Sequence, residues 1–412
     1  MNLATDKAKP APRQSIAVVE APVDDLERRR GLGQFFTSPE VAGFMWDLLE
    51  VIHGKRFSVN TRLIDPACGE GVFLRVAHER GGLPAKNLFG ADIDATLAAG
   101  WQRDPLLRSA HIHLVNGLLD EPASGIEEGA FSIAAGNPPF SGTGLRNLLR
   151  LLDESESPRH EEQDFFEAAS LKEESPSPRQ PLSRQERVEL DRLVRTLSQY
   201  SCWRLETEPE PDEEVETASA GAPTELFAAG ALFDKRRPTA SDYVRAAKLI
   251  AHWPPNRPLD PSQPDVRDAI RRLASTAIEV MFTERFVRLA KPGGLIAVIV
   301  PESIVASDRL GPFRRWLLGR MDLLATVGLP QKVFTDVGAN ARTTILFARR
   351  LVHDRPDGWF SPATLDQLPE DDTPIFLTAP LLDSPNWSLE NYLNSVLASA
   401  RRQRAEFWPN PQ

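Results

Sequence analysis

Three short stretches of the sequence combine residue types that could bind a cofactor and perform chemistry. DPACGEG covers residues 65–71, GADID covers residues 90–94, and GNPPF covers residues 136–140. Each follows a run of apolar residues that is typical of a buried strand. The end of such a strand in an α/β sheet is where polar groups meet a ligand. These stretches are therefore the candidates for binding and catalysis.

The first stretch lies between a predicted strand and a predicted helix. Gly69 and Gly71 allow a ligand to approach the backbone, and the helix N-terminus offers free N–H groups to a carboxylate or phosphate. A tight β–α connection without a ligand would use the same glycines. Asp65 at the strand end shifts the interpretation toward a ligand site.

The second stretch ends in two acids. An acid at the end of the second strand of a nucleotide-type fold accepts hydrogen bonds from ribose hydroxyls. Asp92 and Asp94 are both candidates because alternate strand residues share a face, and Asp92 is nearer the strand end. A solvated acid in a turn is the alternative. Neither loop has the GxGxxG or the GxxxxGK[ST] spacing, which argues against a nicotinamide or ATP enzyme.

The stretches lie within alternating strand and helix patterns, which predict a parallel sheet with right-handed crossovers and an α/β fold. Ser38 is a candidate N-cap for a helix that begins at Pro39. After Phe140 the sequence becomes acidic and rich in Pro and Ser, a composition that buries too little apolar area to offset chain entropy. We expect an insertion at 141–265 that carries some ordered helix.

Composition restricts the class of protein. The chain has 412 residues and a formal net charge of −10, which speaks against a protein that coats nucleic acid through an overall positive field. Cys68 and Cys202 are too few for a disulfide framework, and no Cys/His cluster has metal-site spacing, so no metal is expected. No signal peptide or membrane span is recognisable, so a cytoplasmic protein with no membrane partner is expected.

The order GQFFTSPEVAGFM, LIDPACGEGVF, FGADID, AAGNPPF resembles the N6-adenine DNA methyltransferases, including the methylation subunits of type I restriction-modification systems. The resemblance covers roughly residues 31–140 and 266–350. It implies a class I methyltransferase fold, Rossmann-like, with a mostly parallel seven-stranded sheet and helices on both faces. The implied cofactor is S-adenosyl-L-methionine.

With this resemblance, the chain divides into five expected parts. These are a flexible tail at 1–30, the N-terminal part of the methyltransferase domain at 31–140, the insertion at 141–265, the C-terminal part of the domain at 266–350, and a C-terminal extension at 351–412.

The resemblance also assigns cofactor contacts to three loops. The first would close over the methionine part of the cofactor, the second would line that part, and an acid of the third would hold the ribose. The residues are Phe35, Phe36 and Thr37 in the first loop, Asp65, Ala67, Gly69 and Gly71 in the second, and Asp92 or Asp94 in the third.

GNPPF is the expected catalytic corner. The exocyclic amine of adenine is a poor nucleophile because its lone pair is delocalised into the ring. The Asn137 side-chain oxygen and the Pro138 carbonyl can both accept from N6–H and so aim the lone pair at the sulfonium methyl. Pro138 and Pro139 would keep these acceptors rigid. Phe140 would stack on the flipped base.

One position departs from the family pattern. Where members carry an acid after a glycine in the third motif, VNGLLDEP has Leu118, and Asp120 follows two residues later. The acid is either displaced or absent. One alternative is therefore a cofactor-binding scaffold subunit that is weak or silent in catalysis. Another is methyl transfer to RNA adenine or to a protein glutamine, because the same corner suits a planar amide.

Sequence-specific members of the family need a domain that reads base edges. Only residues 351–412 remain after the expected catalytic domain, which is short for such a domain. We therefore expect adenine-containing DNA as the substrate, and a specificity or complex subunit as the partner that recognises it. The insertion and the C-terminal extension are the candidate docking surfaces.

Overall fold

The computed structural model describes residues 37–140, 145–153, 181–205, 238–330, 342–356, 375–380 and 387–409. Phe35, Phe36 and the expected tail at 1–30 lie outside the described residues.

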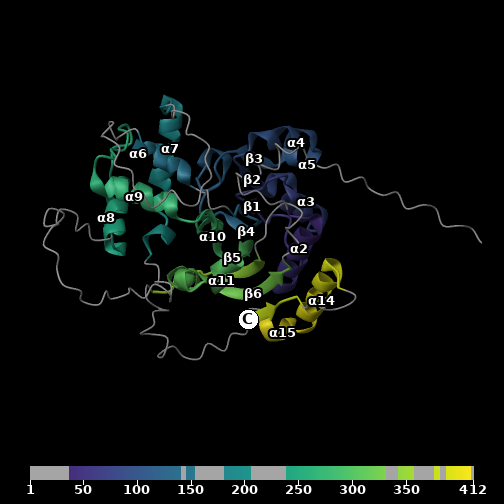
Figure 1. Ribbon diagram of the computed structural model, residues 1–412. Coiled ribbons are helices and arrows are strands. Elements are labelled where there is room, and N and C mark those ends of the chain that lie inside the picture. Colours follow the sequence, from purple (N-terminus) through teal and green to yellow (C-terminus); the bar gives the residue numbers. More distant parts are fainter. Residues whose placement is uncertain are drawn as a thin grey trace, which may run out of the picture.

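An eight-stranded sheet forms the centre of the molecule (Figure 1). Its order is β3-β2-β1-β4-β5-β7-β6-β8, in which β7 is antiparallel to both neighbours and every other pair is parallel. The expected α/β class I methyltransferase fold is confirmed, with eight strands instead of seven. The strands are β1 (Leu63–Asp65), β2 (Leu88–Asp92), β3 (His111–Leu114), β4 (Phe131–Gly136), β5 (Ala290–Pro301), β6 (Met321–Leu329), β7 (Thr343–Arg350) and β8 (Phe376–Thr378).

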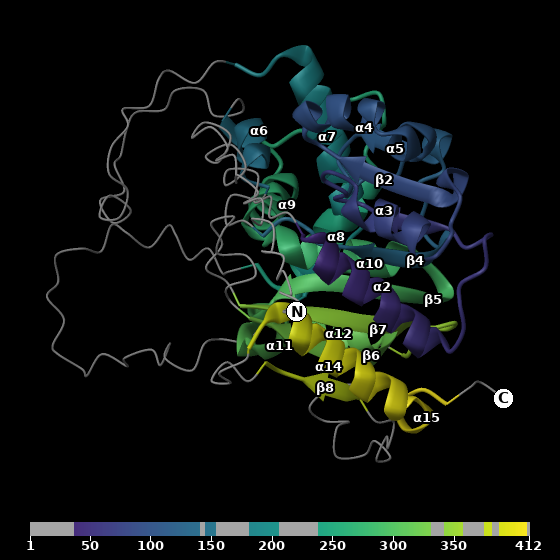
Figure 2. The same cartoon turned by 90° about the vertical axis from the view of Figure 1, so that its right-hand side faces the viewer.

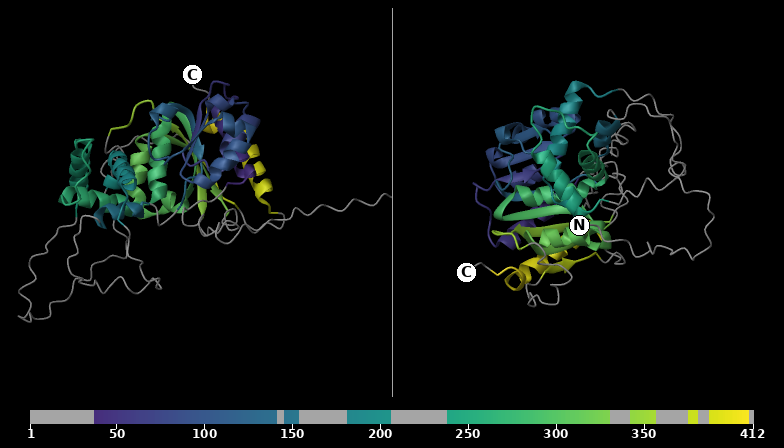
Figure 3. Two further views of the ribbon diagram at one scale, coloured as in Figure 1. Left: turned by 90° about the horizontal axis from the view of Figure 1, so that it is seen from above. Right: turned by 90° about the vertical axis from the view of Figure 1, so that its left-hand side faces the viewer.

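Helices cover both faces of the sheet because its central strands are apolar on both sides (Figure 3). In β5, Ile296, Val298 and Val300 join one buried cluster, whereas Leu295 and Ile299 join the other. This is the alternation that a strand with two buried faces requires. We name the two clusters the α10-side core and the α2-side core.

The α2-side core is closed by α2 (Pro39–His53), α3 (Val72–Glu79), α4 (Ala98–Arg103), α5 (Pro105–Ser109) and α14 (Leu389–Arg402). The Ser38 side chain accepts from Val41 N, which confirms the expected N-cap of α2. Gly54 ends this helix with φ +83°, a conformation that favours glycine.

No helix among the described residues is long and apolar enough to cross a membrane.

The α10-side core contains helices from the range expected to be an insertion. It is closed by α7 (Arg184–Leu197), α8 (Ala240–Ala251), α9 (Pro264–Ser275), α10 (Ile278–Leu289), α11 (Glu302–Ala306) and α12 (Gly311–Leu318). The ordered helices expected within 141–265 are therefore present. They share one apolar cluster with β1 and β5, which the acidic composition around them did not indicate.

The C-terminal extension also packs onto the domain. Its strand β8 adds to the sheet edge beside β6, and its helix α14 lies along α2 (Figure 2). After α14, the short helix α15 (Arg404–Phe407) leads to Trp408, which is 3% exposed and donates from Nε1 to Leu324 O at 3.2 Å. The extension is thus part of the same folded unit.

We predict that Trp408→Ala lowers the free energy of unfolding by about 3–5 kcal/mol, because it removes a buried aromatic side chain and leaves a cavity. Denaturant unfolding measures this difference. Arg402→Ala, at an exposed position of α14, should change stability by less than about 0.5 kcal/mol. Equal effects of the two substitutions would show that the extension is not bound to the domain in solution.

Candidate cofactor and catalytic site

The glycine-rich loop and the catalytic corner meet at the ends of two paired strands. β1 lies between β2 and β4, so Asp65 is flanked by both partner strands. A side chain at Gly136 would place its Cβ 2.3 Å from Asp65 Oδ1, so the carboxylate lies directly against the backbone of Gly136. A side chain at this position would therefore force the Asp65 carboxyl group to move. The sequence placed both motifs at strand ends but did not show this contact.

The glycine-rich loop is held from both sides. Gly69 N donates to Asp92 Oδ2 at 2.8 Å, and Trp101 Nε1 donates to Gly69 O at 2.9 Å. Gly69 has φ +54° and Gly71 has φ +83°, so both require the left-handed region that favours glycine. Trp101 was not among the candidate residues, because a single tryptophan in a short helix carries no spacing signal.

Asp92 and Asp94 have separate structural tasks, which the sequence left open. Asp92 Oδ1 accepts from Asp94 N at 2.9 Å, while its other oxygen binds the glycine-rich loop. Asp94 Oδ1 accepts from Thr96 N at 3.0 Å and from Thr96 Oγ1 at 2.7 Å, as an N-cap does. Both acids are buried. Asp92 is the one that contacts the predicted cofactor loop.

Burial raises the pKa of both site carboxyls that face the loop. Asp65 is 1% exposed, and its pKa lies well above the usual value because of desolvation, with the charge of Asp92 adding to the rise and the Ala67 N–H opposing it. Burial also raises the pKa of Asp92, although the hydrogen bonds from Asp94 N and Gly69 N act to lower it. Two buried acids favour a ligand that brings an ammonium or hydroxyl groups, and they disfavour phosphate.

Two exposed apolar side chains lie near these acids. Ile93, between Asp92 and Asp94, is 56% exposed, and Leu114, which pairs with Asp92 across β2 and β3, is 47% exposed. Large apolar side chains that are exposed at a strand end of a sheet offer a surface to a flat ring. Sequence reasoning considered only the acids here.

The GNPPF corner, the candidate catalytic segment, continues directly from β4. Pro138 is buried, whereas Asn137, Pro139 and Phe140 are half-buried. Phe140 packs against the α2-side core and remains partly accessible. Of the aromatic entrance loop, only Thr37 is described, as a buried residue at the start of α2. The structure thus places Asn137 and Pro138 next to the Asp65 contact, at the same sheet edge as Asp92.

The departure at the third motif has a structural explanation. Leu118 is fully buried in the α10-side core, and its N–H donates to Asn116 Oδ1 at 3.0 Å. Asp120 Oδ1 accepts from Nη1 of the buried Arg285 at 2.8 Å. The later acid is therefore engaged by α10, and the position of the usual acid is a core position in this chain.

The thiol of Cys68 is also buried in the loop, and burial raises its pKa well above the usual value. The thiol therefore stays protonated at neutral pH. It lies where a Cβ at Gly90 would be 2.9 Å from its Sγ, as a small filler between strand and loop.

Comparison with known proteins finds similarity in structure and not in sequence. No family model and no curated protein matches the sequence. A protein from Listeria monocytogenes that bears the name of a class I S-adenosylmethionine-dependent methyltransferase has 13% identity and a TM-score of 0.44, over 90% of this chain and 72% of that one. The methyltransferase subunit of a type I restriction-modification system from Streptococcus thermophilus has 14% identity and a TM-score of 0.38, over 77% and 45%.

The DrdV chain of a DrdV–DNA complex has 11% identity and a TM-score of 0.43, over 91% of this chain and 30% of that one. This chain therefore spans less than half the length of the Streptococcus and DrdV proteins. The likenesses are distant, and the strand order and directions described above carry the fold class.

We predict that the free energy of unfolding of the wild type falls as pH rises through the elevated pKa of Asp65. The folded state binds more protons than the unfolded state between the usual aspartate value and the raised one, so the slope is negative there. Asp65→Asn should reduce this slope and gain stability relative to wild type as pH increases. Glu70→Gln, at an exposed carboxyl of the same loop, should keep the wild-type slope. An unchanged slope in Asp65→Asn would contradict the assignment.

We predict that Leu118→Asp, which restores an acid at the third motif, lowers the free energy of unfolding by about 3 kcal/mol or more, because it buries a carboxylate in an apolar core. Thermal unfolding measures the loss. Leu149→Asp, at a position that is 38% exposed, is the matched control and should be much milder. Similar stability of both variants would mean that the Leu118 side chain can face solvent.

Proposed function

We propose that this protein transfers a methyl group from S-adenosyl-L-methionine to N6 of a flipped adenine in DNA. The observation that carries the proposal is the contact between Asp65 and Gly136. It joins an acidic, phosphate-excluding ligand site to the backbone that leads directly into Asn137 and Pro138. A methyl donor and an amine acceptor must meet at such a junction for direct transfer.

The residues of the ligand site fit the cofactor. S-adenosylmethionine supplies a methyl group on a positively charged sulfur. The carboxylate of Asp65 suits its ammonium group, Asp92 suits the ribose hydroxyls, and the exposed faces of Ile93 and Leu114 suit the adenine ring. The positive-φ turn at Gly69 keeps side chains away from the ligand path. Charges of opposite sign would lower the raised pKa values of the two acids and so stabilise their ionised forms.

The catalytic corner would act on the adenine amine. Asn137 Oδ1 and Pro138 O would accept from N6–H, which favours a lone pair directed at the incoming methyl. The methylated amine is acidic enough to release its proton afterwards, so no strong base is needed. Pro138 is buried, which fixes the two acceptors relative to β4. Phe140 would supply the stacking surface for the flipped base.

Recognition of DNA would depend on a partner subunit, as in a modification or defence system. The described parts of the C-terminal extension, β8, α14 and α15, pack against the domain and complete its sheet edge and α2-side core, so they are not a separate domain for reading base edges. A specificity subunit would then select the target adenine. The surfaces of the insertion and of the extension are the places where this subunit would dock.

A cofactor-binding subunit with weak or no catalysis is the second candidate. The observation that favours it is the burial of Leu118, because the family acid that would contact the cofactor is absent and Asp120 is paired with Arg285. Methyl transfer to RNA adenine or protein glutamine uses the same corner, and only the choice of acceptor separates these activities from the DNA reaction.

We predict that Asn137→Ala lowers methyl transfer from labelled S-adenosylmethionine to adenine-containing duplex DNA by roughly 10²- to 10³-fold, the cost of losing one polar group that stabilises a transition state. Asn87→Ala is the control, because Asn87 donates to Val59 O away from the site. The assay uses the chain alone and the complex purified from its host, with RNA and protein acceptors in parallel.

Several outcomes would contradict the proposal. Transfer that survives Asn137→Ala would refute the proposed role of this side chain. Label that enters RNA or protein instead of DNA would refute the substrate. Cofactor binding without transfer in both the chain and its complex would establish the silent subunit instead.

A further inference from the structure

The loop at residues 117–120, which follows β3, is bound almost entirely by side chains. Its four consecutive carbonyl oxygens cannot join a strand ladder, and buried carbonyls need other donors. Arg285 donates from Nε to Gly117 O at 2.9 Å and from Nη2 to Leu119 O at 2.7 Å. Tyr200 Oη donates to Leu118 O at 2.8 Å, and Arg192 donates to Asp120 O at 3.1 Å.

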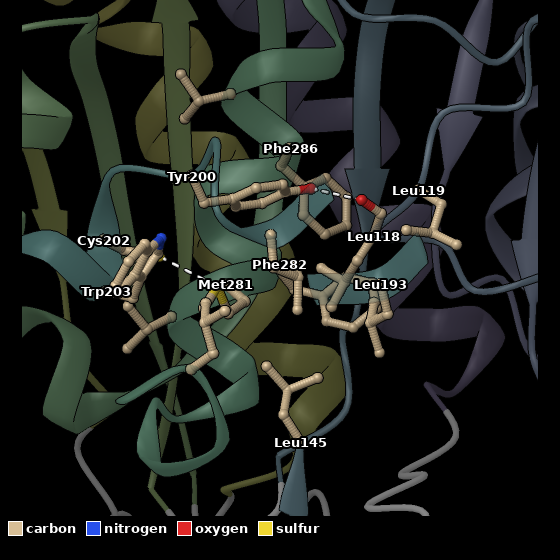
Figure 4. Packing of buried hydrophobic residues seen from close by; sticks show 14 of the residues in the cluster. Leu118, Leu119, Leu145, Leu193, Tyr200, Cys202, Trp203, Met281, Phe282 and Phe286 are labelled. Carbon is tan, nitrogen blue, oxygen red and sulfur yellow. Dashed lines mark hydrogen bonds between the residues drawn. The ribbon is translucent and has the colours of Figure 1, made fainter. Parts of the chain in front are cut away.

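Two of these three donors come from the range expected to be an insertion. Arg192 lies on α7, and Tyr200 lies just after that helix. Tyr200 is 1% exposed and packs with Leu118 and Phe286 in the α10-side core (Figure 4). The hydrogen bond between Tyr200 and Leu118 is therefore shielded from water, where losing a donor leaves a carbonyl unsatisfied.

The same buried region fixes Tyr200 itself. Glu284, on α10, accepts from Ser201 N at 2.8 Å and from Cys202 N at 2.8 Å. Arg288, one turn later, donates to Glu284 Oε1 at 3.2 Å and lies over the Tyr200 ring with its Cζ 4.6 Å from the ring centroid. The phenol thus approaches the 117–120 loop from a rigid position.

The 117–120 loop in turn rests on the glycine-rich loop. A Cβ at Gly117 would lie 1.7 Å from Pro66 O, so the two backbones touch, and Pro66 directly follows Asp65. A shift of the 117–120 loop would therefore displace the glycine-rich loop, whose Gly69 N donates to Asp92. This chain of contacts runs from the inserted helices to the ligand site without a gap.

We propose that Tyr200 is a positioning residue for the glycine-rich loop. The inserted segment 181–205 would then hold this part of the ligand site in place through the 117–120 loop. The inference rests on the proposed function for the identity of the ligand. It assigns to the insertion a task at the cofactor site in addition to any docking of a partner. The tyrosine supports, through a neutral hydrogen bond, a loop that lacks the acid usual in the family.

The test compares Tyr200→Phe with Tyr392→Phe. Tyr392 Oη donates to Gly328 O at 2.9 Å, so the control removes the same kind of hydrogen bond elsewhere in the sheet domain. Tyr200→Phe should raise the Kd of S-adenosylmethionine roughly fivefold, as expected for one lost hydrogen bond, and Tyr392→Phe should leave it within about twofold. Calorimetry of the full chain measures both.

Hydrogen exchange without cofactor provides a readout that does not depend on the ligand. The amides of Cys68, Gly69 and Gly71 are hydrogen-bonded in the glycine-rich loop. Tyr200→Phe should increase their exchange, and Tyr392→Phe should not. If wild type fails to bind S-adenosylmethionine, the proposed function fails while the exchange result still decides the role of Tyr200.

Equal exchange and equal Kd in the two variants would overturn the inference. Should Tyr200→Phe not fold, Arg192→Gln takes its place, because Arg192 is exposed and donates to Asp120 O and Glu121 Oε1. This variant should raise exchange of the same amides, by less than Tyr200→Phe would. No change in exchange would then count against the inference.

Discussion

The burial of the Asp65 carboxylate against the backbone of Gly136 is the constraint on which the site depends. It favours glycine at the end of β4, because a side chain there would displace the carboxylate. It also places a desolvated acid beside Asp92, an arrangement that costs free energy in the unliganded protein. A cationic ligand would offset this cost. The stability of the domain and the affinity for such a ligand are therefore opposed at this position.

A second set of buried charges ties the inserted helices to the sheet. Arg285 is 0% exposed, and its guanidinium is satisfied by Asp120 and two carbonyls. Glu284 is equally buried and receives two backbone N–H groups and Arg288. Removing one partner of a buried ion pair is strongly destabilising, because the other charge is then left buried without compensation. The segment at 198–205 is consequently fixed in place by polar groups as well as by apolar packing.

The sequence predicted those parts of the structure that follow from local rules. The N-cap at Ser38, the glycine-rich connection after β1, and the strands that precede the three motifs depend on spacing within a few residues. The mostly parallel sheet follows from the alternation of strand and helix patterns. The glycine-rich loop and the GNPPF corner follow two strands that pair in this sheet.

Contacts between distant segments could not be predicted in this way. Trp101 meets Gly69, Tyr200 meets Leu118 and Arg285 meets Asp120 across separations of 32, 82 and 165 residues. The local sequence around one residue of such a pair does not predict the other residue, because the topology of the sheet determines which distant segments come into contact. Composition has the same limit. The acidic, proline-rich sequence around α7 and α8 indicated an insertion with some ordered helix, but not that the apolar faces of these helices join the core.

Leucine at position 118 and the helices that cover the 117–120 loop depend on each other. A carboxylate at position 118 would require solvent or a cation, whereas Leu118 is covered by residues of α10 and by Tyr200. Covering this loop with helices is thus compatible with leucine and incompatible with an unpaired acid. The loop keeps its place through donors to its carbonyls, so its position does not depend on a carboxylate at residue 118.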